Sequence, residues 1–265
     1  MVGRPAWSPD NSSVAFLDEQ TRLLQAVDIV TMVPTPLAVL YSGADGAIRP
    51  PVVTRGGPAW SPDGSQIAFI CWDGQGDELC LVESSGNVRQ QVTTLGGAGA
   101  APGAAARSSV TAIAWSPDST ALAVAVQAEQ RGATAGVFRI ELAGRSGRRL
   151  TNMTANSPLV WDALADDLIF SASVEGRSDV YRLPATGGKA LNITATLAEG
   201  ARDPASDAAG ALAVVSGSHI VVLPAGAGET VVHAETQLAC SAPALSPNGT
   251  YLAYLALAEP IEQYP

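Results

Sequence analysis

The chain of 265 residues is 47% apolar and only 15% charged, a composition that can bury a large core and excludes wholesale disorder. Its formal net charge of −10, with Lys189 as the single lysine, makes nucleic acid a poor partner, because surfaces that follow phosphates are basic. No apolar run approaches the roughly 18 residues of a membrane helix, and the first residues lack the apolar stretch of a signal peptide. We therefore expect a folded chain with no membrane span.

Six related segments follow one another along the chain. They begin near residues 4, 57, 111, 158, 202 and 242, and they read PAWSPDNSSVAFLD, PAWSPDGSQIAFIC, IAWSPDSTALAVAV, LVWDALADDLIFSA, DPASDAAGALAVVS and PALSPNGTYLAYLA. The step from one copy to the next is roughly 40 to 55 residues, close to the period of propeller blades. We expect a single domain, residues 1–265, built from these six units.

Each copy predicts four short β-strands. The turn is followed by an apolar run such as QIAFIC or ALAVAV, which is rich in β-branched and aromatic residues. A second run, such as ELCLV or DVYRL, follows a loop, and a glycine turn then leads to a third, as in SSGNVRQQVT. The strand that carries the tryptophan completes the set. Short strands, frequent turn signals and no helical period predict four-stranded antiparallel sheets with almost no helix.

The S-P-D-G type segment predicts a β-turn between the first and second strands of each unit. Proline presets φ for the first central position, aspartate accepts backbone N–H groups, and glycine supplies a positive φ. We expect the preceding tryptophan to be more than about 80% buried as an anchor between units, rather than to stack on a ligand. The residues of this structural motif are Trp7, Pro9, Asp10, Trp60, Pro62, Asp63, Trp115, Pro117, Asp118, Trp161 and Pro247.

WSPDG, the apolar strand, the DVYRL-type strand and the Gly-Gly turn that leads to L-T together resemble the TolB-like propeller repeat, also called the WD40-like PD40 repeat. The resemblance implies an all-β, six-bladed β-propeller of four-stranded antiparallel blades. It is weaker in the first unit, whose middle (LLQAVDIVTMVPTPLAVL) lacks the glycine turn, and in the fifth, which has lost the Trp, Pro and Asp. It implies protein-binding or scaffold roles, although the same propeller also gates prolyl-oligopeptidase-like hydrolases.

Signatures of catalysis are sparse. A G-x-S-x-G nucleophile elbow is missing, and His219 and His233 fall within strand patterns. The Gly-Gly before Lys189 reads as a hairpin turn rather than a phosphate loop. Three cysteines are too few for a zinc site or a disulfide scaffold. We expect no enzyme, no catalytic residues, no cofactor and no metal.

The loop CWDGQGDELC carries the densest carboxylate cluster, Asp73, Asp77 and Glu78. We interpret it as a solvated acidic hairpin tip, with a calcium site as the alternative. Trp72 is either a hot spot for a partner or a residue that packs on the rim of the next blade. The loops of one propeller face are expected to gather the candidate binding residues, which are Arg55, Trp72, Asp73, Asp77, Arg131, Glu175, Arg177, Arg202 and Asp203.

The leading functional hypothesis is a non-catalytic propeller that binds a protein, or else a peptide or glycan, at one mouth of its central channel. The alternatives are a regulatory propeller separated from a hydrolase, a lyase that uses residues of the channel, or an ectodomain fragment of a longer sensor or lipoprotein. The resemblance implies a periplasmic or extracellular location, while a cytoplasmic one stays open, and the oligomeric state is not indicated.

Three further expectations follow from the strand pattern. Cys71 and Cys80 lie on consecutive strands, where they sit opposite each other as a disulfide or as two buried thiols. The Gly/Ala/Pro stretch from Leu95 to Ser109 is expected to form a mobile surface loop. The last unit offers only two strands before the sequence ends, so we expect it to be incomplete, within a longer natural chain, and to expose an apolar strand edge.

Overall fold

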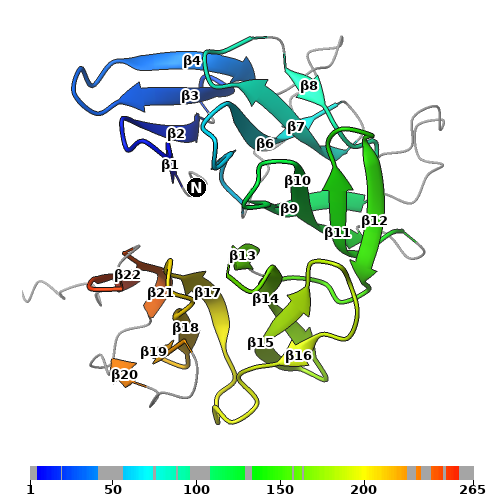
Figure 1. Cartoon of the computed structure of the whole chain (residues 1–265), viewed down its shortest axis with the longest axis vertical. Helices are drawn as coiled ribbons and strands as arrows, with labels where there is room; N and C mark the ends of the chain where they lie inside the picture. Colours follow the sequence, from blue (N-terminus) through cyan, green and yellow to red (C-terminus); the bar gives the residue numbers. More distant parts are fainter. Residues whose placement is uncertain are drawn as a thin grey trace, which may run out of the picture. The chain divides into compact units, whose positions relative to one another are not determined.

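The computed structural model contains only β-strands among its regular elements, over the part of the chain that it describes (Figure 1). The described residues are 5–18, 20–40, 56–73, 76–87, 89–95, 108–128, 133–156, 158–162, 164–225, 231–233, 240–246 and 249–256. The predicted all-β class and the predicted lack of helix agree with this content. The chain divides into two compact units, residues 1–155 and 156–265.

In the first unit the described residues form three antiparallel sheets, each made of four strands that are consecutive in the chain. The first sheet contains β1 (Ala6–Trp7), β2 (Ser13–Asp18), β3 (Leu23–Asp28) and β4 (Pro34–Val39). The second contains β5 (Ala59–Trp60), β6 (Gln66–Trp72), β7 (Asp77–Glu83) and β8 (Gln90–Gln91). The third contains β9 (Ser108–Trp115), β10 (Ala121–Ala128), β11 (Gly136–Glu141) and β12 (Ser146–Thr151).

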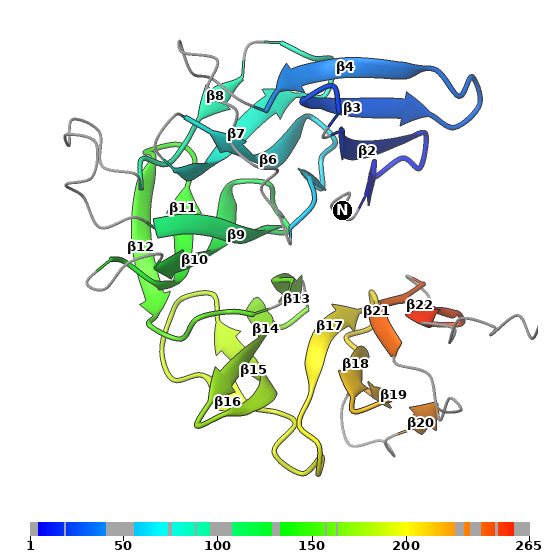
Figure 2. The same ribbon diagram turned by 180° about the vertical axis from the view of Figure 1, so that it is seen from behind.

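The described residues of the second unit continue the same pattern with ten strands (Figure 2). One sheet contains β13 (Val160–Asp162), β14 (Asp167–Val174), β15 (Arg177–Pro184) and β16 (Leu191–Asn192). The next contains β17 (Arg202–Ser206), β18 (Leu212–Ser216), β19 (His219–Leu223) and β20 (Val231–His233). The last has two strands among the described residues, β21 (Cys240–Leu245) and β22 (Leu252–Ala256), as the strand count predicts. Two large apolar side chains are exposed here: Tyr251, just before β22, and Leu255, within β22.

The SPD segments form the predicted turns between the first two strands of a sheet. In the second sheet the N–H of Gly64 donates to the carbonyl of Ser61, 2.9 Å away, and Gly64 has a φ of 73°. Asp63 Oδ1 accepts the N–H of Ser65, and Ser61 Oγ accepts the N–H of Gln66. The serine before the proline therefore caps the turn together with the aspartate, a role that the sequence pattern does not reveal by itself.

The same turn in other sheets tolerates different residues. Asn11 and Ser119 occupy the position of the glycine with φ near 60°, so a side chain is accepted there. In the fifth sheet Asp207 replaces the serine, and its Oδ1 accepts the N–H groups of Ala209 and Ala211. The turn thus still forms in this sheet, although its sequence segment has lost the Trp and the Pro. Pro247 lies outside the described residues.

The tryptophans before the turns are not equally buried. Trp115 and Trp161 are 7% and 9% exposed, as expected of anchors, and Trp115 Nε1 donates to the carbonyl of Ala59 in the preceding sheet at 2.9 Å. Trp60 is partly buried in the core cluster between the first two sheets. The prediction is wrong for Trp7, which is 57% exposed, because unit 1 begins with its sheet and no earlier sheet of the unit covers the indole.

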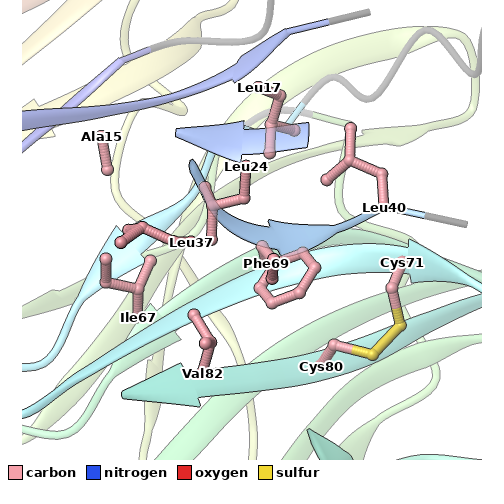
Figure 3. Close-up of a cluster of buried hydrophobic side chains, with 11 residues drawn as sticks. Ala15, Leu17, Leu24, Leu37, Leu40, Ile67, Phe69, Cys71, Cys80 and Val82 are labelled. Carbon is pink, nitrogen blue, oxygen red and sulfur yellow. A yellow bond between two sulfur atoms is a disulfide. The ribbon is translucent and has the colours of Figure 1, made fainter. Parts of the chain in front are cut away.

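The core of unit 1 lies between neighbouring sheets. Between the first and second sheets, Leu24 and Leu37 face Ile67 and Phe69 (Figure 3). β6 is buried along nearly its whole length, so its side chains pack on both faces, which explains why its apolar run is continuous rather than alternating. Leucine, isoleucine and phenylalanine side chains at 0% exposure give this junction most of its hydrophobic stabilisation.

A disulfide joins Cys71 and Cys80 within this core, with a Cα–Cα distance of 5.8 Å (Figure 3). Of the two alternatives that the sequence leaves open, the structure has the disulfide, but the expectation that the cysteines sit opposite each other is wrong. Cys71 lies opposite Glu78, and Cys80 lies opposite Phe69, so the two cysteines are diagonal neighbours in the ladder. Their separation is larger than that of a directly opposed non-hydrogen-bonded pair and still suits a disulfide.

The carboxylates that follow the β6–β7 loop are not a solvated tip, so that expectation is wrong. Asp77 is 5% exposed and Glu78 is fully buried. Glu78 is held because Thr93 Oγ1 and the N–H of Leu95 both donate to its carboxylate, at 2.5 and 2.6 Å. These bonds tie the segment after β8 to β7 and satisfy a carboxylate that would otherwise be costly to bury.

The fourth sheet repeats this arrangement. Thr194 Oγ1 donates to Asp179 and accepts the N–H of Val180, just as Thr93 does toward Glu78 and Leu79. The acidic residue near the start of the third strand and the threonine just after the fourth strand are therefore a structural pair.

The predicted loop from Leu95 to Ser109 is shorter than expected. Ser108 and Ser109 are buried at the start of β9, and Leu95 is bonded to Glu78. Residues 96–107 lie outside the described part. His219 and His233 belong to β19 and β20, and Gly187 turns the chain between β15 and β16 with a φ of 86°, as predicted.

Candidate functional site

Three SPD turns lie together at one end of unit 1. The second and third turns are joined directly, because the N–H of Asp63 donates to Ser119 Oγ at 3.1 Å. The first and second turns flank the same groove. A row of aspartates, Asp10, Asp63 and Asp118, therefore marks this end, which we call the turn end.

The aspartates of the turn end are strongly acidic. The hydroxyl of Ser8 donates to Asp10 and lowers its pKa to about 2, with further bonds from Ser12. In the same way Ser116 lowers the pKa of Asp118 to about 2. The pKa of Asp63 is also lowered, chiefly by the hydroxyl of Ser61. These carboxylates therefore stay ionised throughout the physiological pH range.

An open groove of about 360 Å³ lies between the first and second turns. Asp10 and Asp63 line it from the two sides, and Trp60 contributes an indole. Nε1 of Trp60 is buried and has no hydrogen-bond partner among the described residues, unlike Nε1 of Trp115. The remaining lining residues are Ser8, Pro9, Ser12, Gly64 and Ser84.

The low pKa values predict how the turns respond to acid. Because the folded pKa of Asp118 lies below its ordinary value of 3.8, its contribution to stability is complete above about pH 4 and is lost as pH falls toward 2. We expect carboxyl-detected NMR titration to give Asp10 and Asp118 midpoints near 2. Ser116→Ala should raise the midpoint of Asp118 and leave that of Asp10 unchanged. A wild-type midpoint of 3.8 for Asp118 would contradict the role of Ser116.

The described members of the candidate set named from the sequence lie at the ends of the sheets opposite their β-turns of the SPD type. In unit 1, Trp72 ends β6 and its N–H donates to the carbonyl of Leu40 at 2.8 Å. Asp73 Oδ1 accepts the N–H of Gly76, and Asp77 is buried opposite Trp72. These three residues lie together. Arg55 and Arg131 lie outside the described residues.

In unit 2 the predicted arginines are engaged in local contacts. Arg177 Nε lies 2.9 Å from Asp179, and Arg177 also donates to the carbonyl of Leu197. Arg202 forms an ion pair with Asp203 at 3.1 Å and donates to the carbonyl of Cys240 in the next sheet. These bonds hold loops and neighbouring strands. Glu175 is a turn residue with a φ of 52°.

Neither a metal centre nor a membrane helix is found among the described residues. No group of three or more His, Cys, Asp or Glu side chains is placed there to hold a metal ion. None of the elements in that part is a helix with the length and apolarity to cross a membrane.

The fold is that of a β-propeller, as comparisons with solved structures show. The structure of putative TolB from Agrobacterium tumefaciens matches with a TM-score of 0.68 and 17% identity, over 97% of this chain and 91% of that one. TolB from Acinetobacter baumannii matches with a TM-score of 0.55 and 19% identity over 87% of this chain, which spans 56% of that protein. The predicted fold class is confirmed, and each sheet is a blade.

Proteins of different kinds share this fold. Oligogalacturonate lyase from Vibrio parahaemolyticus matches with a TM-score of 0.64 and 12% identity, over 94% of this chain and 72% of that one. No curated protein sequence matches the chain at a significant level. A family model described as the TolB beta propeller domain, PD40, matches residues 48–259.

Proposed function

We propose, since the chain belongs to the TolB β-propeller family, that it is a non-catalytic domain that binds a partner protein. The observation that carries the proposal is the groove at the turn end, where Asp10 and Asp63 flank the indole of Trp60. Two ionised carboxylates beside an aromatic ring suit a basic side chain of a partner, which would form ion pairs and a cation–π contact. The groove is open, so a side chain on a protein surface can enter it.

The chemistry of the site supports binding rather than catalysis. A general base works best when its pKa lies near the operating pH, whereas the pKa of Asp10 is about 2. The oxygens of Asp10 and Asp63 accept hydrogen bonds from serines of their own turns, which fixes both carboxylates in place. Fixed, permanently charged groups are suited to electrostatic recognition.

We also propose that the domain works in the periplasm or outside the cell. The disulfide between Cys71 and Cys80 supports this location, because disulfides persist in oxidising compartments. The membership of the TolB family supports it as well.

The test of the groove compares charge-removing variants at equivalent turns. Asparagine at positions 10 and 63 keeps an oxygen that accepts the backbone N–H bonds of the turn and removes the charge. Asp118→Asn makes the same change in a turn that does not line the groove. Each protein is immobilised and exposed to an envelope extract of the source organism, and the bound proteins are quantified by mass spectrometry.

We expect a specific partner whose recovery falls about tenfold with Asp10→Asn and Asp63→Asn together, and falls likewise in about 0.5 M salt. Asp118→Asn should bind like the unmodified protein. Equal recovery with all variants would overturn the assignment of the groove. A reaction catalysed by the purified domain on an added substrate would overturn its description as non-catalytic.

A further inference from the structure

The hairpin between β3 and β4 ends in an exposed apolar tip. Ile29, Val30, Met32 and Val33 are 42%, 85%, 69% and 60% exposed, respectively, although each is a large apolar residue. In both overall views the loop that joins β3 to β4 stands at the outer margin of the unit, away from β6 and β7 (Figures 1 and 2). We call residues 29–33 the apolar finger.

The apolar finger lies at the turn end. The N–H of Ile29 donates to the carbonyl of Ser12 at 3.0 Å, and Ser12 lines the groove. At the base of the finger Asp28 accepts the N–H groups of Val30 and Thr31, and the bonds from Thr31 lower the pKa of its carboxyl. The finger therefore stands beside ionised aspartates.

The other blades provide an internal comparison. The N–H of Ser84 donates to Ser65 O, that of Leu142 to Thr120 O and that of Ala185 to Asp166 O, in the manner of Ile29 and Ser12. These bonds align the finger with the residues Ser-Ser-Gly-Asn, Leu-Ala-Gly-Arg and Ala-Thr-Gly-Gly that begin at positions 84, 142 and 185. Apart from Leu142, which packs against the core, the aligned residues are small or polar. A run of large apolar side chains is not needed to form this turn.

Met32 occupies a backbone position that favours glycine. Its φ is 56°, in the left-handed region. The third blade also has a side chain at the aligned position, Arg145 with a φ of 47°, whereas the second and fourth blades use Gly86 and Gly187, one position earlier, with φ of 78° and 86°. A methionine in this conformation is less favourable than a glycine because its Cβ crowds the backbone. Met32 therefore does not stabilise the turn, and because its side chain is exposed it does not contribute to the core either.

We propose that the apolar finger inserts into an apolar pocket of a partner protein, next to a basic surface of that partner that faces the acidic turn end. The inference rests on the proposed function and names the chemistry of the partner. A few apolar anchors in a pocket can supply most of the binding energy of an interface, with charged groups around them giving orientation.

Other occupants fit the finger less well. Asp10 and Asp28 carry negative charge beside it, which repels anionic lipid headgroups, and the finger has no tryptophan, tyrosine or basic residue of the kind that anchors proteins at membrane surfaces. Addition of a strand from a second copy is disfavoured because β4 is the edge strand and begins Pro-Thr-Pro. Pro34 and Pro36 offer no N–H for a new ladder.

The experiment places a photo-cross-linking amino acid, p-benzoylphenylalanine, at Val30 of the full chain. The matched control carries it at Ser85, the equivalent position of the second blade. Both proteins are irradiated in an envelope extract, and unlabelled competitor is added as the unmodified chain or as the variant Val30→Ser with Met32→Gly. The glycine suits the backbone at position 32, so this competitor is expected to be at least as stable as the unmodified chain, and thermal unfolding checks that it folds.

We expect one discrete adduct from position 30 and none from position 85. The unmodified chain should compete for it at about tenfold lower concentration than the variant, and the cross-linked segment of the partner should line an apolar pocket flanked by Lys or Arg. Equal competition by both chains, or adducts from both positions, would overturn the proposal.

Two further arms separate the finger from its alternatives. If the chain binds vesicles of phosphatidylcholine and phosphatidylglycerol and the variant Val30→Ser with Met32→Gly does not, the finger binds lipid rather than a protein. If the chain self-associates in sedimentation and this variant does not, the finger binds a second copy of the chain. A cross-linker at Ser12 reports on the groove. An adduct from Ser12 without one from Val30 would leave the proposed function standing while the finger fails.

Discussion

Replacing Trp115 with alanine is expected to lower the free energy of unfolding by about 3 to 5 kcal/mol. The indole is 7% exposed and packs in the core cluster between the second and third blades. Its loss leaves a cavity between two blades and removes the hydrogen bond to the carbonyl of Ala59. Chemical denaturation followed by circular dichroism measures the change without relying on tryptophan fluorescence.

Two variants separate the parts of this effect. Trp115→Phe keeps most of the ring and removes the hydrogen bond, so we expect a loss of about 1 kcal/mol from that bond plus a small packing cost. Trp7→Ala makes the same change as Trp115→Ala at an indole that is 57% exposed, and we expect a loss within about 1 kcal/mol. If Trp7→Ala and Trp115→Ala lowered the free energy of unfolding equally, burial of the indole would not determine how much the substitution destabilises the protein.

Removal of the disulfide is expected to cost about 2 to 4 kcal/mol. Cys71 and Cys80 are nine residues apart, so the bridge restricts a short loop of the unfolded chain. Both side chains are also buried among apolar neighbours of the first two blades. The variant Cys71→Ala with Cys80→Ala should unfold at a lower denaturant concentration than the oxidised protein.

The control for the disulfide is a reducing agent. It should destabilise the unmodified protein by a similar amount and leave the double variant unchanged, because Cys240 is buried and is not part of a disulfide. If mass spectrometry of the non-reduced protein finds free thiols at both positions, the bridge does not form. A reduced protein as stable as the oxidised one would show that the bridge is present and contributes little.

Much of the fold follows from local sequence signals. The S-P-D-G segment fixes a turn through proline, the serine hydroxyl and the aspartate, so its position in each blade is readable from the sequence. Whether a side chain is buried depends on the neighbouring blade that packs against it, and local sequence signals carry no information about that neighbour. Trp7 and Trp115 stand in nearly the same motif, yet only Trp115 is preceded by a blade within its unit.

The same limit explains the error at Glu78. The polar run DGQGD directly precedes it in the sequence and suggests solvent exposure. Its partner Thr93, however, lies 15 positions later, after the fourth strand of the blade. The threonine after the fourth strand, which follows Val92 in one blade and Ile193 in another, is a signal from which this pair could be identified, since Thr194 holds Asp179 in the same way. For the cysteines, strand order predicts the bridge, while the register of the ladder decides which residues oppose each other.

The candidate site is less accessible from the sequence than the fold. The sequence marks Asp10 and Asp63 as turn residues, which they are, but the groove exists because two turns about 50 residues apart lie side by side. In the sequence, the hairpin of the apolar finger stands out only for its missing glycine. Its meaning depends on the exposure of Val30 and Met32, which no periodicity reveals.

The order of the strands has a consequence for how the chain can evolve. Every strand pair in the described sheets joins elements that are adjacent in the sequence, and each turn is closed by bonds between residues a few positions apart. Contact order is therefore low within a blade, and stability is distributed in nearly one-dimensional fashion, blade by blade. A blade such as the fifth can then lose its tryptophan and proline while Asp207 still closes the turn. Substitutions in one blade therefore do not require compensating substitutions in the others, so a surface feature such as the apolar finger can arise in a single blade.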